Sequence, residues 1–177
     1  WVRRVRYSPD GTRLATAGMN GEAKVLDAVT GEELLTLSGH TDSIFGLAYS
    51  PDGTRLATAS HDMTVKVWDA ESGKLLMTLS KEGHGDGVYG GLLPGILDVT
   101  FSADGTQLAS AGADGTVVVW DAMTGKELLA LPSNGNAIIN LAFSPDGKHL
   151  VTNSDQNAEF PAVATMWDLA TGKSVFT

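Results

Sequence analysis

A four-residue pattern that returns three times constrains the fold of this chain most strongly. Ser8-Pro9-Asp10-Gly11 recurs at residues 50–53, at 102–105 with alanine in place of proline, and at 144–147, with spacings of 42, 52 and 42 residues. A second marker keeps the same phase, at Leu26-Asp27, Trp68-Asp69, Trp120-Asp121 and Trp167-Asp168. Two markers in step indicate four internal repeats, each a single supersecondary unit.

Apolar residues between the markers recur in columns typical of short strands. The columns are Val5, Leu47, Val99 and Leu141 in a first strand, and Leu14, Leu56, Leu108 and Leu150 in a second. Alternating pairs such as Val65 and Val67 predict a third strand, and pairs such as Leu76 and Leu79 predict a fourth. Tight turns separate the strands, because Pro-Asp-Gly presets one φ angle and supplies a left-handed position. The sequence therefore predicts an all-β chain of four four-stranded antiparallel units.

Composition excludes several classes of partner. The formal net charge of −9 would repel a phosphate backbone, so we expect no nucleic-acid partner. No apolar run reaches the roughly 20 residues that span a bilayer, so membrane insertion is not expected. The chain has no cysteine, which excludes disulfides and cysteine-ligated zinc. A cytoplasmic location is the expectation, although the lack of cysteine suits a reducing or an oxidising compartment equally.

Three motifs resemble the WD-repeat family over the whole chain. They are Gly39-His40, Ser60-His61-Asp62 and Val67-Trp68-Asp69. The resemblance implies a β-propeller whose blades are the four repeats. Since WD-type blades generally close as rings of six to eight, we expect this chain to be part of a larger ring. The ring would be completed by further blades of a longer parent chain, or alternatively by a second copy.

The resemblance also implies a hydrogen-bonded network inside a blade. In the second repeat its members are His40, Ser60, Asp62 and Trp68, joined in a chain from Asp62 through His40 and Ser60 to Trp68. This role is structural, because a half-buried indole N–H and an imidazole each need a partner. We expect only the second repeat to hold the complete set. The third repeat has Gly112 at the serine position, and His84 stands two residues later than the repeat predicts.

The repeats divide the chain into blades at residues 1–37, 38–79, 80–131 and 132–177. Two insertions interrupt the regular spacing, a glycine-rich one at 81–95 and a second near 155–161. The first joins two blades and the second joins two strands within one blade, so strand alternation places both on the same face. Loop variation on one face of a rigid scaffold is where function is expected.

Further residues correspond to the family's common contact positions. They lie at the start of each innermost strand or just before the turn aspartate, and they are Trp1, Arg3, Met19, Ser43, Phe45, His61, Gly95, Leu97, Ala113, Ala137 and Ile139, with Tyr89 added from the first insertion. Several are large and apolar, as binding hot spots are. Trp1 and Phe45 are equally consistent with partner contacts and with packing under the insertion.

These observations favour a non-catalytic interaction scaffold that binds a protein or peptide on the face of the insertions. The repeated sequence Ser-Pro-Asp-Gly-Thr-Arg-Leu-Ala-Thr is similar to that of bacterial members of the family. This similarity suggests that the chain is the sensor or recruitment module of a larger signalling protein. A small-ligand sensor at the channel mouth is the alternative, and a channel-site hydrolase is a weaker one. No cofactor or metal is expected, since the sequence offers no nucleophile elbow and no tight cluster of ligands.

Overall fold

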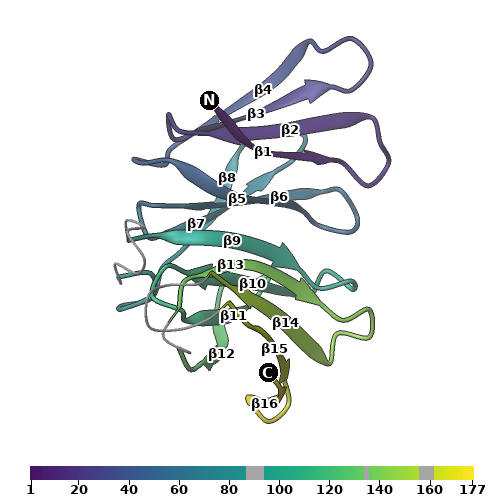
Figure 1. Ribbon diagram of the computed structural model, residues 1–177. Helices are drawn as coiled ribbons and strands as arrows, with labels where there is room; N and C mark the ends of the chain where they lie inside the picture. The colour runs from purple at the N-terminus through teal and green to yellow at the C-terminus, as the bar shows by residue number, and fades with distance from the viewer. Residues whose placement is uncertain (87–93, 134–135, 156–161) are drawn as a thin grey trace.

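The computed structural model describes residues 1–86, 94–133, 136–155 and 162–177. The prediction of an all-β chain is confirmed, because sixteen strands in this described part form four antiparallel sheets of four strands. Each sheet comprises four consecutive strands, and we name the sheets blades 1 to 4 in chain order. The blades succeed one another along the molecule, with blade 1 at one end and blade 4 at the other (Figure 1).

The strands have the following bounds. Blade 1 contains β1 (Val2–Tyr7), β2 (Arg13–Gly18), β3 (Glu22–Asp27) and β4 (Glu33–Ser38). Blade 2 contains β5 (Ile44–Tyr49), β6 (Arg55–Ser60), β7 (Val65–Asp69) and β8 (Leu75–Leu79). Blade 3 contains β9 (Ile96–Phe101), β10 (Gln107–Gly112), β11 (Val117–Asp121) and β12 (Glu127–Leu131). Blade 4 contains β13 (Ile138–Phe143), β14 (His149–Ser154), β15 (Ala164–Asp168) and β16 (Lys173–Phe176).

The recurring Ser-Pro-Asp-Gly motif forms the hairpin between the first two strands of each blade. In blade 1 the backbone N–H of Arg13 donates to Ser8 Oγ at 2.9 Å, and the N–H of Thr12 donates to the Asp10 carboxylate at 3.1 Å. Gly11 adopts a φ of +73°, a left-handed conformation that glycine adopts without strain. The same set of bonds returns in blades 2, 3 and 4, which explains why the motif repeats.

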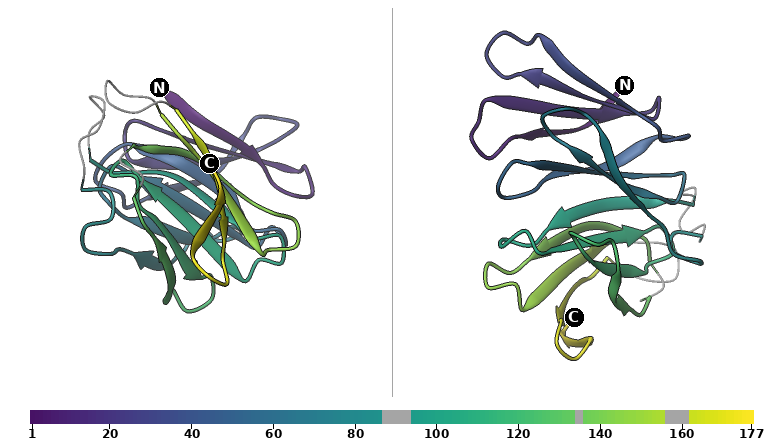
Figure 2. Two further views of the ribbon diagram at one scale, coloured as in Figure 1. Left: turned by 60° about the horizontal axis from the view of Figure 1, so that its bottom comes forward. Right: turned by 180° about the vertical axis from the view of Figure 1, so that it is seen from behind.

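The hydrophobic core lies between successive blades. Between blades 1 and 2 it contains Val25 and Leu37 on one side and Leu47, Leu56 and Trp68 on the other, all nearly inaccessible to solvent. Equivalent clusters join blade 2 to blade 3 and blade 3 to blade 4. Blades 2 and 3 therefore each bury one face against the preceding blade and the other against the following one. Figure 2 shows the succession of blades from behind.

Arginine side chains reinforce two of these junctions. Arg13 Nη1 donates to the carbonyl of Ala70 at 2.7 Å, and Arg55 Nη1 donates to the carbonyl of Ala122 at 2.5 Å. The corresponding residue of blade 3 is Gln107, whose Oε1 is buried without a hydrogen-bond partner. The junction between blades 3 and 4 therefore lacks a bond that the other two junctions have.

The outer faces of the two end blades are uncovered. Val2 and Tyr7 of β1 are each 65% exposed, whereas Ile44, which occupies in blade 2 the place of Val2, is fully buried against blade 1. At the other end of the molecule, Val175 and Phe176 of β16 are also exposed. Val2 and Phe176 thus face solvent at positions whose counterparts in blade 2, Ile44 and Met77, pack against a neighbouring blade.

Candidate functional site

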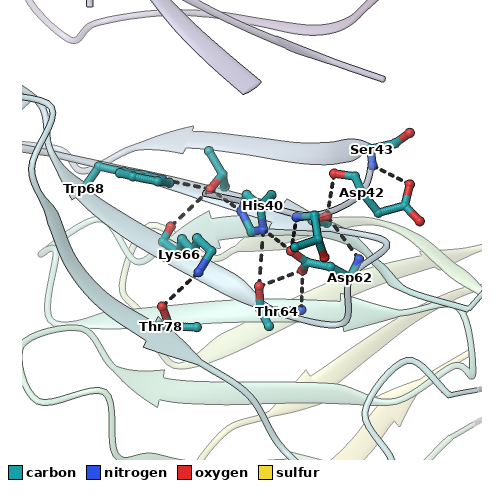
Figure 3. A network of polar contacts seen from close by, with 11 residues as sticks. His40, Asp42, Ser43, Asp62, Thr64, Lys66, Trp68 and Thr78 are labelled. Atoms are coloured by element: carbon teal, nitrogen blue, oxygen red, sulfur yellow. Dashed lines mark hydrogen bonds and ion pairs between the residues drawn. The ribbon is translucent and has the colours of Figure 1, made fainter. Parts of the chain in front are cut away.

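Within blade 2, His40 is hydrogen-bonded on both sides of its ring (Figure 3). Its Nδ1 lies 2.8 Å from Asp62 Oδ2, and its Nε2 lies 2.7 Å from Thr58 Oγ1. The indole Nε1 of Trp68 donates to the same Thr58 oxygen at 2.9 Å. A carboxylate, an imidazole, a hydroxyl and an indole therefore form one buried chain in which each group has a partner.

The prediction that Ser60 links His40 to Trp68 is wrong, because Thr58 occupies that place. In the register of β6 and β7, Trp68 lies opposite Leu56 and Ser60 lies four residues further along β6, beside the turn. Ser60 Oγ instead donates to the carbonyl of Asp42 at 3.0 Å and accepts the backbone N–H of Asp62 at 3.1 Å. Ser60 thus holds the turn that positions Asp62.

The Asp62 carboxylate is stabilised in its charged form. Burial alone would raise its pKa, but hydrogen bonds from His40, from the Thr64 hydroxyl and from the Thr41 backbone N–H hold the pKa well below its usual range. Asp62 is therefore ionised at neutral pH. Its contacts are all internal, which supports a structural role for the network.

Blade 3 contains a second network, contrary to the expectation that only blade 2 would be complete. His84 Nε2 lies 2.9 Å from Ser110 Oγ, which accepts the indole N–H of Trp120 at 2.9 Å. The Nδ1 of His84 lies 2.7 Å from the Thr116 hydroxyl, which donates to Asp114. Burial lowers the pKa of His84 to about 4, so the ring is neutral at neutral pH.

His84 lies within the first insertion, which joins blade 2 to blade 3. The backbone N–H of Gly95, the last residue of the insertion, donates to the carbonyl of Gly85 within it at 2.8 Å. Gly95 also lies against His61 of blade 2, because a Cβ at Gly95 would come within 2.5 Å of the His61 Cα. The last residue of the insertion therefore packs directly on His61, a predicted contact residue. Residues 87–93 of the insertion, which include Tyr89, lie outside the described residues.

The ends of the second insertion lie at the same end of the blades. The N–H of Asp155 donates to the carbonyl of Ala137 at 2.9 Å, next to the start of β13. Ala137 belongs to an apolar cluster that includes Leu97 at the start of β9. Residues 156–161 of this insertion lie outside the described part of the chain.

Three predicted contact residues are stacked across blades 1 and 2. The guanidinium carbon of Arg3 lies 4.2 Å from the centroid of the Phe45 ring. On blade 2 itself, the Phe45 and His61 rings are parallel, with centroids 3.9 Å apart and an interplanar angle of 7°. We call Arg3, Phe45 and His61 the cation stack. Burial lowers the pKa of His61, which favours its neutral form.

The remaining predicted contact residues surround the cation stack or support it. Trp1 and Met19 are exposed, and Ile139 is half-buried. Leu97 departs from the expectation, because only 4% of it is exposed. It forms an apolar cluster with Ala113 and Ala137, against which Phe45 and Ile139 pack. Leu97 therefore supports the surface from beneath and offers a partner almost no contact area.

Sequence reasoning missed a polar link between the innermost strands. Arg4 Nε donates to the Phe45 carbonyl at 2.6 Å, and Arg4 Nη2 lies 3.9 Å from Asp98 Oδ1. The other Asp98 oxygen accepts the backbone N–H of Leu141 at 2.9 Å. All four blades are joined in this way. Gly46 permits the close approach, since a Cβ there would lie 2.9 Å from the Asp98 Cα.

The described residues contain no group of three or more histidine, aspartate or glutamate side chains arranged to hold a metal ion. In the same residues, no helix is long and apolar enough to cross a membrane. The aspartates of the repeated turns accept hydrogen bonds from neighbouring serine or threonine hydroxyls and from backbone N–H groups, which lowers their pKa values and explains their recurrence.

Comparison with solved structures shows the same fold in another protein. A chain of the hydrazine synthase of Kuenenia stuttgartiensis superposes with a TM-score of 0.84 at 19% identity, covering 98% of this chain and 47% of that one. At this level of identity the likeness concerns the fold alone.

Curated relatives extend well beyond this chain in length. Protein HIR1 of Cryptococcus neoformans is 32% identical over 184 residues, which cover 94% of this chain and 21% of the relative. WD repeat-containing protein 1 of Xenopus tropicalis is 41% identical over 121 residues, which cover 68% of this chain and 12% of the relative. The chain thus spans about a fifth or less of the length of these relatives.

The family model described as "WD domain, G-beta repeat" matches four stretches of the chain. They are residues 1–27, 31–69, 73–121 and 125–158, and each contains the first three strands of one blade or most of them. The matches cover most of the sequence and agree with the networks in blades 2 and 3. The chain therefore belongs to the WD-repeat family.

Proposed function

We propose that this chain is a non-catalytic scaffold that binds a protein or peptide at the end of the blades where β1, β5, β9 and β13 begin. WD-repeat proteins generally serve as protein-interaction scaffolds, which supports the general role. The cation stack is the observation that carries the location, because it presents an ordered cation and an aromatic ring at this end of the blades. Preorganised aromatic and arginine side chains are typical of binding hot spots.

The convergence of the two insertions supports the same face. Gly95 at the end of the first insertion packs against His61, and the N–H of Asp155 at the start of the second donates to the Ala137 carbonyl. At the opposite end of the blades, the repeated turns have their polar groups engaged in internal hydrogen bonds. The two insertions that interrupt the repeat spacing therefore begin or end at the same end of the blades as the cation stack.

We further propose that additional blades of the same parent chain complete the propeller. The uncovered faces of blades 1 and 4 support this, because Val2 and Tyr7 occupy positions that are covered in the inner blades. A second copy of the chain is the alternative occupant of these faces. We also propose a recruitment role within a larger bacterial signalling protein, which is supported only by the amino-acid sequence of the repeats.

Site-specific photocrosslinking in extracts of the source organism tests the proposed face. A photoreactive phenylalanine analogue replaces Met19 beside the cation stack or, as a matched control, Met123 in a turn at the opposite end of blade 3; both methionines are exposed. We expect a discrete crosslinked protein from position 19 alone, and its loss when Phe45→Ala is added. Equal crosslinking from both positions, or crosslinking that Phe45→Ala leaves unchanged, contradicts the proposed face.

A further inference from the structure

The Arg3 guanidinium is positioned but has no anionic partner within the described part of the chain. Among the described residues it stacks on the Phe45 ring, and no carboxylate there lies within ion-pair distance of it. Arg4 differs, because it is engaged with the Phe45 carbonyl and with Asp98. A guanidinium that stacks on an aromatic face keeps the N–H donors along its edges available for a planar acceptor.

The surroundings of Arg3 favour an acceptor that carries a negative charge. The ring beneath Arg3 is backed by His61, and burial lowers the pKa of that histidine, so the platform is neutral at neutral pH. Apolar surface continues from Phe45 towards Ile139, both of which are half-buried. A ligand that fits this arrangement combines one carboxylate with adjacent apolar groups.

We infer that Arg3, held flat on Phe45 and His61, binds a single aspartate or glutamate side chain of a partner's docking segment whose neighbouring residues are apolar. The inference rests on the proposed protein-binding function and names the chemistry of the partner. The formal net charge of −9 opposes a partner with many acidic residues, so the carboxylate stands alone in the segment. Two parallel N–H···O bonds to a carboxylate supply both affinity and orientation.

A peptide selection tests this inference on the intact chain. A displayed library of random 12-residue peptides is selected on the wild-type chain and counter-selected on Phe45→Ala. Each enriched peptide is then synthesised in two forms, with its acidic residue intact and with the corresponding amide. Affinities of both forms are measured for wild type, Arg3→Met, Arg3→Lys and Arg6→Met. Arg6 is an exposed arginine of the same strand, so its variant controls for the loss of one positive charge.

We expect the amide form to bind wild type about tenfold more weakly than the acid form. Arg3→Met removes this difference, Arg3→Lys restores it only in part because lysine lacks the planar fork, and Arg6→Met preserves it. If acid and amide forms bind wild type equally while Phe45→Ala still abolishes binding, the carboxylate inference is overturned and the proposed face stands. If no peptide is enriched over Phe45→Ala, both proposals fail. Thermal unfolding of every variant confirms that each is folded.

Discussion

The indole Nε1 of Trp120 donates to the Oγ of Ser110 at 2.9 Å, the same contact that Trp68 makes with Thr58 in blade 2. In blade 4 the indole of Trp167 likewise donates to a hydroxyl, that of Thr152, at 3.1 Å. In each blade that has the tryptophan, a hydroxyl on the second strand accepts a hydrogen bond from the indole N–H. Blade 1 has Leu26 at the position of the tryptophan. Residues 1–38, all of which the structure describes, contain no histidine that could form such a network.

Replacing Thr58 with valine tests the network of blade 2. Valine keeps the shape of threonine but leaves the Trp68 N–H and the His40 Nε2 buried without their shared partner. We expect the free energy of unfolding to fall by about 2 kcal/mol, measured by urea denaturation. Thr16→Val is the matched control, because Thr16 occupies the same place in blade 1 opposite Lys24. It should change stability by less than about 0.5 kcal/mol; similar losses in both variants would contradict a special role for Thr58.

The pKa of His84 makes the stability of the chain depend on pH. The unfolded histidine has a pKa of 6.5 and the folded one a pKa of about 4, so the unfolded state binds more protons between these values. The contribution of neutral His84 to the free energy of unfolding is therefore complete above pH 6.5 and is lost as the pH falls towards 4. We expect wild type to lose about 2 kcal/mol more than His84→Gln between pH 7.5 and pH 5. Urea unfolding at both pH values measures the difference, and parallel losses would show that His84 is accessible to protons in the folded state.

The repeats made the fold predictable from the sequence. Four copies of each marker average out local ambiguity, so the columns that contain Leu56 and Trp68 identify strands and the faces they bury. The repeat pattern also predicts that Val2 is buried, as Ile44 is in blade 2. Val2 is exposed because no blade packs against this side of blade 1 in the structure.

The polar contacts were less predictable, because they depend on register and on distances between blades. Ser60 and Thr58 lie on the same face of one strand, so alternation alone does not say which reaches Trp68. His84 lies within the insertion at 81–95 and two residues later than the repeat predicts, so the spacing did not reveal that it joins the network of blade 3. The stacking of Arg3 on Phe45 joins two blades and leaves no signal within either repeat.

Replacing Gln107 with arginine should strengthen the junction between blades 3 and 4. Arg13 and Arg55 each donate to a carbonyl of the next blade, whereas Gln107 has a buried oxygen without a partner. The equivalent carbonyl in blade 4 is that of Leu169, which lines the same groove as Gln107. We expect Gln107→Arg to raise the free energy of unfolding by about 1 kcal/mol and Arg55→Gln to lower it by a similar amount. A loss of stability in Gln107→Arg, measured by thermal and urea unfolding, would show that the groove does not admit the guanidinium.

Asp98 of β9 contacts Arg4 of β1 on one side and the Leu141 backbone of β13 on the other, and two substitutions separate these roles. Asp98→Ala leaves the Leu141 N–H buried without an acceptor, which should cost about 1–3 kcal/mol of folding free energy. Asp98→Asn keeps an oxygen for that N–H and removes a charge whose burial raises the pKa of the carboxyl, so its stability at pH 7 should remain near that of wild type. Arg4 provides the final comparison, because its guanidinium lies 3.9 Å from the carboxylate. Arg4→Met should cost less in the Asp98→Asn background than in wild type, by up to about 1 kcal/mol in a double-mutant cycle. Equal costs in the two backgrounds would mean that Arg4 stabilises the fold only through its bond to the Phe45 carbonyl. Asp98 would then join the innermost strands only through its bond to the Leu141 N–H.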